Sequence, residues 1–322
     1  MDDGARARTI VASVLAWWQV ARVERDRLPW RSTSDPWEVL VAETMLAQTT
    51  VGRVSQRYPL FLASLPTPGA CARTPAGEVV RLWAGLGYYR RALGLHGAAR
   101  AIVERHGGEV PATLGELLAL PGVGPYTARA VLVTAFGAQA AVVDTNVGRV
   151  LARAVAGRPL RMPEAQRTAD TLVPPGRSRD WNLALMDFGS IVCRSRRPSC
   201  SSCPVAREGA CAWRGGAAGA AGAAGADEAG TSAACPDMSR GDPADPAAGS
   251  AGVTGRQSRF PGSDREGRGR IVRAACDAPV SPADLARVAG WPADVDRAHR
   301  VAEALVADGL LVCGAGGELR LP

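Results

Sequence analysis

The chain has 322 residues, of which 47% are hydrophobic, a length and composition that allow two folded domains with substantial cores. It has no apolar run long enough to cross a bilayer, and its N-terminus lacks the cationic start and small-residue cleavage site of a secretory signal, so we expect a cytoplasmic protein without membrane contact. The net charge is +7, and every permanently positive side chain is an arginine because lysine is absent. This basic excess favours a polyanionic partner over a membrane.

Helical hydrophobic spacing dominates residues 1–213. Ile10, Val14 and Trp18 mark a first amphipathic helix, and a later helical pattern runs from Leu95 to the "HGG" at 106–108. Short breaks containing Gly or Pro separate such patterns, and no convincing alternating strand occurs. The sequence therefore predicts an all-α domain over residues 1–213.

One acidic residue stands out in the predicted helix "DPWEVLVAETML" (35–46). Asp35 can cap its N-terminus, Pro36 suits the first helical position, and Glu38 completes a capping box. Glu43 instead lies among apolar residues that leave this helix almost no polar face. A carboxyl group in such surroundings either pairs with an arginine, which is the commoner fate, or keeps its proton for acid chemistry.

Residues 117–131, "LLALPGVGPYTARAV", predict two helices joined by a tight turn. Gly122 and Gly124 let the backbone turn sharply and approach a neighbour closely. The second helix would offer its first amide N–H groups to an anion, as a helix-hairpin-helix does when it grips a DNA phosphate without reading bases. The same pattern also occurs as an ordinary turn between helices.

Eight cysteines in a cytoplasmic chain point to metal or redox chemistry rather than to structural disulfides. Four are scattered and are interpreted as small hydrophobic or loop residues. The other four have six, two and seven residues between them and lie in "CRSRRPSCSSCPVAREGAC" (193–211): Cys193, Cys200, Cys203 and Cys211. One Cys-x2-Cys pair flanked by two single cysteines fits a [4Fe–4S] cluster better than a zinc site, which more often has two such pairs. The arginines between these ligands would make the ordered loop basic enough to lie along phosphates.

Composition changes abruptly after Trp213. Residues 214–262 are rich in Gly, Ala, Pro and Ser and nearly free of large apolar residues, so we expect a disordered linker that buries nothing. Order is expected again over residues 263–322, where three short helices precede two strands around a Gly-rich turn, "LLVCGAGGELRLP". This pattern is typical of a small winged-helix-like α+β module, a fold that serves DNA contact and partner packing alike.

Several motifs in a fixed order relate residues 28–211 to a known family. They are "LPWR", "VAETMLAQTTVGRV", "WAGLGYYRRALGLHGAA", "LPGVGPYTARAV", "VVDTNVGRV", "WNLALMDFGSIVC" and the cysteine loop. In these segments the chain resembles the helix-hairpin-helix DNA glycosylases, and among them the adenine glycosylases that remove adenine mispaired with 8-oxoguanine or guanine. The resemblance implies an all-α helix-hairpin-helix glycosylase fold of two helical subdomains with an iron–sulfur cluster loop. It also implies duplex DNA containing a mispaired adenine as the partner, and we expect a monomer.

The resemblance assigns roles to individual residues. Glu43 matches the catalytic glutamate and Asp144 the catalytic aspartate, while Tyr126 stands where the glycosylases with lyase activity have a lysine. Gln48 and Tyr88 match residues that wedge into the duplex. Four more residues fall where the family lines its adenine pocket: Trp30, Arg31, Asn182 and Asp187. The remaining candidates for DNA contact are Gly122, Gly124 and Asn146.

The chain also departs from the family's pattern. Many members have "QQT" where this chain has Ala47, Gln48 and Thr49, so one wedge or opposite-base contact is absent. Members often have "DGN" where Thr145 follows Asp144 here, and the last cysteine spacing is longer than usual. Members commonly end in a Nudix-like domain that inspects 8-oxoguanine, and nothing after the linker resembles it. These departures concern the preferred opposite base more than the chemistry.

Two carboxyl groups in opposed environments suit the cleavage of an adenine glycosidic bond. Adenine leaves readily only once a ring nitrogen is protonated, and Glu43 in an apolar helix can hold that proton near neutral pH. Asp144 would stabilise the positive charge on the sugar, and a helix N-terminus would lower its pKa. The plain alternatives are that Asp144 is only a helix N-cap and that Glu43 is only the buried partner of an arginine.

The leading prediction is a monofunctional adenine glycosylase without lyase activity, because the chain has no lysine to form an imine with the opened sugar. One alternative is a thymine–guanine mismatch glycosylase on the same scaffold. Another is a non-catalytic DNA-binding protein with a structural cluster. The presence of both Glu43 and Asp144 argues against the last alternative, since binding alone needs neither.

Overall fold

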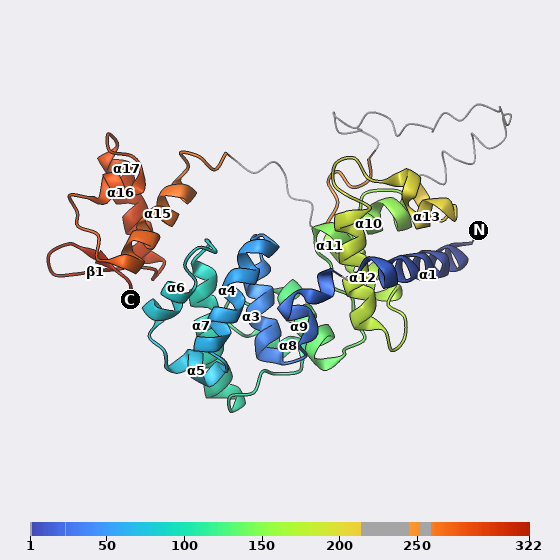
Figure 1. Ribbon diagram of the computed structural model, residues 1–322, viewed down its shortest axis with the longest axis horizontal. Helices are drawn as coiled ribbons and strands as arrows, with labels where there is room; N and C mark the ends of the chain where they lie inside the picture. The colour runs from blue at the N-terminus through green and yellow to red at the C-terminus, as the bar shows by residue number, and fades with distance from the viewer. Residues whose placement is uncertain (1, 23, 214–244, 252–258) are drawn as a thin grey trace. The chain divides into compact units, whose positions relative to one another are not determined.

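The structure is a computed structural model that describes residues 2–22, 24–213, 245–251 and 259–322, and the regular secondary structure of the described part is almost entirely helical (Figure 1). The expected all-α class is thereby confirmed for residues 2–22 and 24–213. The chain divides into two compact units. Unit 1 comprises Met1–Arg27 and Gly137–Arg256, and unit 2 comprises Leu28–Phe136 and Gln257–Pro322.

Unit 1 is a helical body in which the N-terminal helix α1 packs against α12. The predicted amphipathic stripe of α1 is observed, since Ile10, Val14 and Trp18 are buried in a core that they share with Trp181 and Phe188 of α12. The helices of this unit are α1 (Asp3–Ala21), η1 (Arg25–Arg27), α10 (Thr145–Val150), the π-helical turn η2 (Leu151–Ala156), α11 (Met162–Thr171), α12 (Ser178–Ile191), η3 (Cys200–Ser202) and α13 (Pro204–Arg207).

The helical part of unit 2 is built around α3 (Pro36–Leu46), which packs against α4 and α9. The predicted cap of α3 is observed, because the Asp35 carboxylate accepts a hydrogen bond of 2.9 Å from the Glu38 amide. Nearly all sides of α3 are apolar, as expected of a helix surrounded by others. The neighbouring helices are α2 (Pro29–Ser32), α4 (Val51–Ser64), α5 (Pro68–Arg73), α6 (Ala76–Leu82), α7 (Arg90–His106), α8 (Leu114–Leu118) and α9 (Pro125–Phe136).

The turn between α8 and α9 lies directly on α7, backbone against backbone. Gly122 in this turn has a φ of +74°, and a Cβ atom added to it would lie 3.0 Å from the Cα atom of Gly94 in α7. One turn further along α7, a Cβ atom on Gly97 would lie 3.2 Å from the Cβ atom of Pro121. Only glycine tolerates both the left-handed conformation and the close approach at position 122.

The C-terminal residues form the expected three helices and hairpin. They are α15 (Asp264–Asp277), α16 (Leu285–Ala289), α17 (Val295–Ala307) and the antiparallel strands β1 (Val312–Cys313) and β2 (Leu319–Arg320). This module contacts α6 within unit 2. The amide of Gly77 donates to the Pro322 carbonyl at 3.1 Å, and Arg81 Nε donates to the Cys276 carbonyl at 2.9 Å.

Most of the expected linker, residues 214–262, lies outside the described residues. Within it, residues 245–251 are described and pack against unit 1, where Ala247, Ser250 and Ala251 are buried. This stretch differs from the expected disordered segment that buries nothing. Its small side chains allow close approach to the helical surface, and Asp245 pairs with the buried Arg153.

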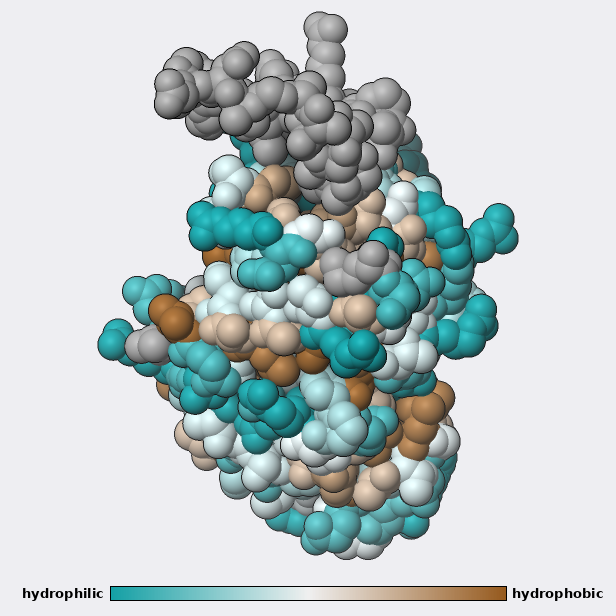
Figure 2. Space-filling view, turned by 90° about the vertical axis from the view of Figure 1, so that its right-hand side faces the viewer, coloured by the Kyte–Doolittle hydropathy of each residue, from teal (hydrophilic) through white to brown (hydrophobic). Residues whose placement is uncertain are grey.

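In the part of the chain that the structure describes, no helix has both the length and the apolar character needed to cross a bilayer. On the face shown in Figure 2, hydrophobic residues are interspersed with strongly hydrophilic ones.

Candidate active site and cysteine-lined cavity

Asp144 is the N-cap of α10, and its side chain is held by two donors. One carboxylate oxygen accepts from the Val147 amide at 2.7 Å, and the other accepts from the Asn146 side-chain amide at 2.7 Å. The predicted capping role is confirmed by this geometry. Both oxygen atoms have fixed positions, so the carboxylate is preorganised before any ligand binds.

The pKa of Asp144 differs from the expected direction. Burial raises it above the ordinary aspartate value, and this effect outweighs the hydrogen bonds from Val147 and Asn146, which lower it. The helix N-terminus alone led us to expect a lowered pKa, but desolvation of the charged form is the larger influence here. The Asn146 side chain therefore matters more than expected, because its hydrogen bond favours the ionised form of this partly buried carboxylate.

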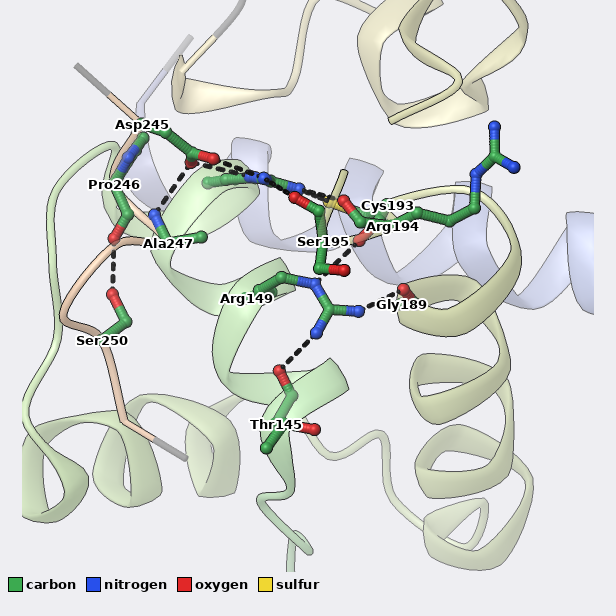
Figure 3. Close-up of polar contacts among 11 residues, drawn as sticks. Thr145, Arg149, Gly189, Cys193, Arg194, Ser195, Asp245, Pro246, Ala247 and Ser250 are labelled. Carbon is green, nitrogen blue, oxygen red and sulfur yellow. Dashed lines mark hydrogen bonds and ion pairs between the residues drawn. The ribbon is translucent and has the colours of Figure 1, made fainter. Parts of the chain in front are cut away.

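Asn146 connects Asp144 to the cysteine loop through Arg149, which is buried. Figure 3 shows Arg149 donating to the carbonyl groups of Thr145 and Gly189. Arg149 Nη2 donates to Asn146 Oδ1 at 2.9 Å and to the Gly189 carbonyl at 2.7 Å. Arg149 Nε donates to the Cys193 carbonyl at 3.2 Å. A continuous series of hydrogen bonds thus runs from the candidate catalytic carboxylate to the backbone of the first cysteine.

The predicted pocket residues Asn182 and Asp187 both lie on α12 and are buried in unit 1. Asn182 supports the backbone just before Asp144, since its Oδ1 accepts from the Val142 amide at 2.7 Å and its Nδ2 donates to the Ala140 carbonyl at 2.9 Å. The Asp187 carboxylate accepts from Trp18 Nε1 at 3.1 Å. It also forms an ion pair of 3.0 Å with Arg25, a residue that did not stand out in the sequence.

In unit 2, the candidate residues Glu43 and Tyr126 lie on α3 and α9, two helices that pack against each other. Glu43 is partly exposed, although Ala42 and Met45 on the same helix are buried. The apolar environment expected for this carboxyl group is therefore partial, and solvent or a ligand can reach the residue. Tyr126 is also partly exposed, at the start of the helix that follows the hairpin glycines.

The two predicted wedge residues share an unusual backbone conformation. Gln48 has a φ of +60° and Tyr88 a φ of +47°, values that non-glycine residues rarely adopt. Both are exposed, Tyr88 by 43%, whereas its neighbour Tyr89 is buried. One tyrosine of the pair therefore packs in the core and the other projects outward. Strained residues of this kind concentrate at ligand-binding sites.

Arg91 holds the two wedge segments together. Its Nη1 donates to the carbonyl groups of Thr44 at 2.8 Å and Met45 at 3.0 Å, and its Nη2 donates to Thr49 Oγ1 at 2.8 Å and to the Gly87 carbonyl at 3.2 Å. Burial lowers the pKa of Arg91 to about 10. The Arg91 guanidinium thus links Met45 and Thr49, which flank Gln48 in the sequence, to Gly87, which directly precedes Tyr88.

The remaining pocket candidates, Trp30 and Arg31, lie on the short helix α2 of unit 2. Trp30 is buried and stacks edge-to-face on Tyr58, with 5.7 Å between ring centroids. Arg31 is partly exposed. The Trp30 ring therefore packs in the core of unit 2 and leaves Arg31 as the more accessible of the two.

One cavity of unit 1 is lined by all four predicted metal ligands, Cys193, Cys200, Cys203 and Cys211. Apolar side chains such as Phe188, Val192 and Val205 complete its lining. Among the residues that the structure describes, no three His, Cys, Asp or Glu side chains converge closely enough to bind a single metal ion. Four thiols arranged around a common apolar cavity fit a multi-iron cluster, in which each iron takes one cysteine, better than a tetrahedral zinc.

Three arginines with structural roles were missed in the sequence: Arg149 and Arg153, which are buried, and Arg91, which is partly buried. Each donates mainly to backbone carbonyl groups or to a distant carboxylate, and such partners leave no local pattern. A weak signal exists for two of them, since Arg149 and Arg153 are four residues apart in an otherwise apolar helical stretch.

Comparison with known proteins agrees with this geometry. Residues 41–175 match the HhH-GPD superfamily base excision DNA repair protein family. The adenine DNA glycosylase of Mycobacterium tuberculosis (strain CDC 1551 / Oshkosh) is 38% identical over 318 residues, which cover 96% of this chain and 92% of that protein. A thymine/uracil-DNA glycosylase of Methanothermobacter thermautotrophicus is 37% identical over 214 residues, which cover 64% of this chain and 96% of that protein.

The solved structure of a thermostable thymine-DNA glycosylase is also similar, with a TM-score of 0.60 and 33% identity over 66% of this chain and 98% of that chain. The two thymine glycosylases thus match about two thirds of the chain. The mycobacterial protein matches nearly all of it, including the C-terminal region that lacks a Nudix-like pattern. The chain therefore belongs to the adenine DNA glycosylase family of the HhH-GPD superfamily.

Proposed function

We propose that the chain is a monofunctional adenine DNA glycosylase that hydrolyses the N-glycosidic bond of adenine mispaired with 8-oxoguanine or guanine in duplex DNA. The observation that carries the proposal is the preorganised carboxylate of Asp144, which is partly buried and held by Val147 and Asn146. It is supported by similarity to an adenine glycosylase over 96% of the chain, whereas the thymine/uracil glycosylase matches 64%.

Glu43 and Asp144 divide the chemistry between them. Glu43 donates a proton to a ring nitrogen of the adenine, and the bonding electrons of the glycosidic bond then leave with the neutral base. Asp144, as the anion, stabilises the positive charge that develops on the sugar. Water adds to the anomeric carbon and loses a proton, which leaves free adenine and an abasic sugar.

The DNA contacts come from unit 2. The hairpin with Gly122 and Gly124 offers amide groups at the start of α9 to a backbone phosphate. Tyr88 and Gln48 fill the space that the base vacates when it leaves the stack. Trp30, Arg31, Asn182 and Asp187 are proposed to shape the adenine pocket. For Asn182 and Asp187 this role is indirect, since their described hydrogen bonds are made within unit 1.

We further propose that the four cysteines hold a [4Fe–4S] cluster, which would serve as a structural and electron-accepting group at the loop. The loop carries Arg194, Arg196 and Arg197, and its order would present these side chains to DNA phosphates. The protein would act as a cytoplasmic monomer, and the C-terminal module would add affinity or partner contact rather than chemistry.

A thymine–guanine mismatch glycosylase is the second candidate, favoured by the similarity to the thermostable thymine-DNA glycosylase. Both candidates use the same scaffold, so the base that is released decides between them. Tyr126 is compatible with either, since neither reaction needs an enzyme amine.

One assay tests the proposal. Duplexes with adenine opposite 8-oxoguanine, guanine or cytosine, and one thymine–guanine duplex, are incubated with excess protein and then treated with alkali. We expect rapid cleavage at adenine opposite 8-oxoguanine or guanine and little at the other two. Preferential release of thymine would establish the second candidate, and no release from any duplex would refute both.

A further inference from the structure

A short segment of unit 1, residues 245–251, lies beside α10, and we refer to it as the strap (Figure 3). Ala247, Ser250 and Ala251 of the strap are buried. The Ala251 amide donates to the Leu160 carbonyl at 2.7 Å, and the Ser250 hydroxyl accepts from the Leu160 amide at 3.3 Å. The strap is therefore seated on the unit by its backbone as well as by its side chains.

The position of the strap depends on Gly148 of α10. A Cβ atom added to Gly148 would lie 2.1 Å from the carbonyl oxygen of Ala251, so any larger residue would displace the strap. Gly148 belongs to the helix that Asp144 caps, and Arg149 follows it. The strap thus contacts α10, the same helix that Asp144, the candidate catalytic carboxylate, caps at its N-terminus.

Arg153 joins the strap to the cysteine loop. Its side chain is 1% exposed, and it donates to both carboxylate oxygens of Asp245, from Nε at 2.8 Å and from Nη2 at 2.5 Å. Its Nη1 donates to the Arg194 carbonyl at 2.7 Å and approaches Cys193 Sγ at 3.6 Å. Nη2 also reaches the Ser195 carbonyl at 3.4 Å. One guanidinium therefore contacts the strap, the loop backbone and a candidate cluster ligand.

Two positively charged side chains lie beside Cys193, and Asp245 is the carboxylate that pairs with one of them. Arg153 contacts the sulfur of this cysteine and Arg149 its carbonyl group, so two buried, permanently charged guanidinium groups border one ligand. A buried charge without a partner is strongly unfavourable, and here the strap supplies the opposite charge to Arg153. Asp245 lies 92 residues from Arg153 in the sequence and well beyond Cys211, so the strap is not part of the cysteine loop.

We propose that Asp245 is a positioning residue for the cluster: as the counter-ion of Arg153, it fixes the N–H group on Cys193 Sγ and offsets the positive charge beside it. The proposal rests on the presence of the [4Fe–4S] cluster proposed above. The potential of such a cluster depends on net charge and on hydrogen bonds to its sulfur ligands, and Asp245 acts on both through Arg153. Because reduction adds negative charge, an unbalanced Arg153 would favour the reduced cluster and raise its potential.

The test uses the full-length, cluster-loaded protein and the isosteric change Asp245→Asn. Asp242→Asn is the matched control, since residues 242–244 repeat the Asp-Pro-Ala sequence of residues 245–247 and lie outside the described residues. Iron content, release of ferrous iron to a chromogenic chelator and the cluster potential by voltammetry are measured. We expect Asp245→Asn to raise the potential and to release iron several-fold faster, and Asp242→Asn to match the unaltered protein in both. Asp245→Glu, which retains the charge, should restore the potential at least in part.

Equal potentials and equal iron release in Asp245→Asn and Asp242→Asn would overturn the proposal. A second measurement requires no variant: hydrogen exchange of the loaded protein should show the Ala251 amide protected. Exchange of this amide at the rate of an unstructured peptide would also overturn it. Absence of iron from the unaltered protein would instead refute the cluster, while exchange at Ala251 would still report whether the strap is seated.

Discussion

The guanidinium group of Arg91 lies 2.8 Å from the hydroxyl group of Thr49 and is thereby fixed between two strained segments of unit 2. Gln48 precedes Thr49 directly, and Tyr88 follows Gly87, another acceptor of Arg91. Its Cζ atom also lies 5.4 Å from the centroid of the Tyr88 ring. A single, partly buried side chain thus sets the spacing of both residues that are proposed to enter the duplex.

Arg91→Ala should loosen these segments. Loss of the donor leaves several buried acceptors unsatisfied, so we expect the free energy of unfolding to fall by about 1–3 kcal/mol. Extrusion of the target base, followed by the fluorescence of 2-aminopurine at the adenine position, should fall more than duplex affinity. Arg90→Ala is the control, because the Arg90 side chain is 73% exposed and its ion pair with Asp308 is long. Equal effects of the two changes would contradict this role.

Asp144→Asn should strongly slow base removal while leaving duplex binding largely intact, because the change removes the charge and keeps the shape. We expect a loss of about 10²–10³-fold in the single-turnover rate. Binding is measured with a duplex that carries a non-hydrolysable adenosine analogue. Near-normal cleavage would show that Asp144 serves only as a helix cap.

Glu43→Gln should slow base removal by about 10²–10⁴-fold, since it removes the proton donor without changing the size of the side chain. Glu38→Gln on the same helix is the matched control, because Glu38 lies in the first turn of α3. Similar single-turnover rates for the two variants would show that Glu43 does not act as the acid.

Asn146→Ala should move the acidic limb of the pH–rate profile. Asp144 acts as the anion, so the rate falls as the pH drops through its pKa. Burial already raises that pKa, and the Asn146 hydrogen bond opposes the effect. Without this bond the pKa rises further, and the loss of rate should begin at a higher pH. Gln139→Ala removes an amide of unit 1 that donates to the Val173 carbonyl instead, and it should leave the limb unchanged.

The product should be an intact strand with an abasic site, broken only after alkali or heat. Strand cleavage by a glycosylase with lyase activity requires an amine that forms an imine with the opened sugar, and this chain has no lysine. Arginine cannot replace it because its guanidinium group stays protonated. Borohydride should therefore trap little or no protein–DNA adduct. Efficient trapping would mean that the N-terminal amine takes part.

Local features of the fold could be predicted because their determinants lie within a few residues. Asp35 caps α3 through the amide of Glu38, and Gly107 ends α7 in the left-handed conformation, so both helix ends follow from the sequence. In these cases periodicity and capping are sufficient.

Features that depend on distant partners could not be predicted. The direction of the Asp144 pKa was wrong because the helix N-terminus is a local effect, whereas burial comes from the tertiary packing of unit 1. Arg153 finds its carboxylate 92 residues further on, in a segment whose composition indicates disorder. The sequence has no periodic signal for such a pair, because neither Asp245 nor its small neighbours belong to a helix or strand.

The contact between Gly94 and Gly122 has a mechanical consequence. Two backbones that touch without intervening side chains leave no room to slide, so the hairpin and α7 must move as one piece. The hairpin is the proposed grip on a phosphate, and α7 begins just after Tyr88. The distance between the point where the strand is held and the point where the tyrosine enters is then a fixed length of the protein. The contact between these two glycines would therefore determine how many nucleotides separate the bound phosphate from the base that can be displaced.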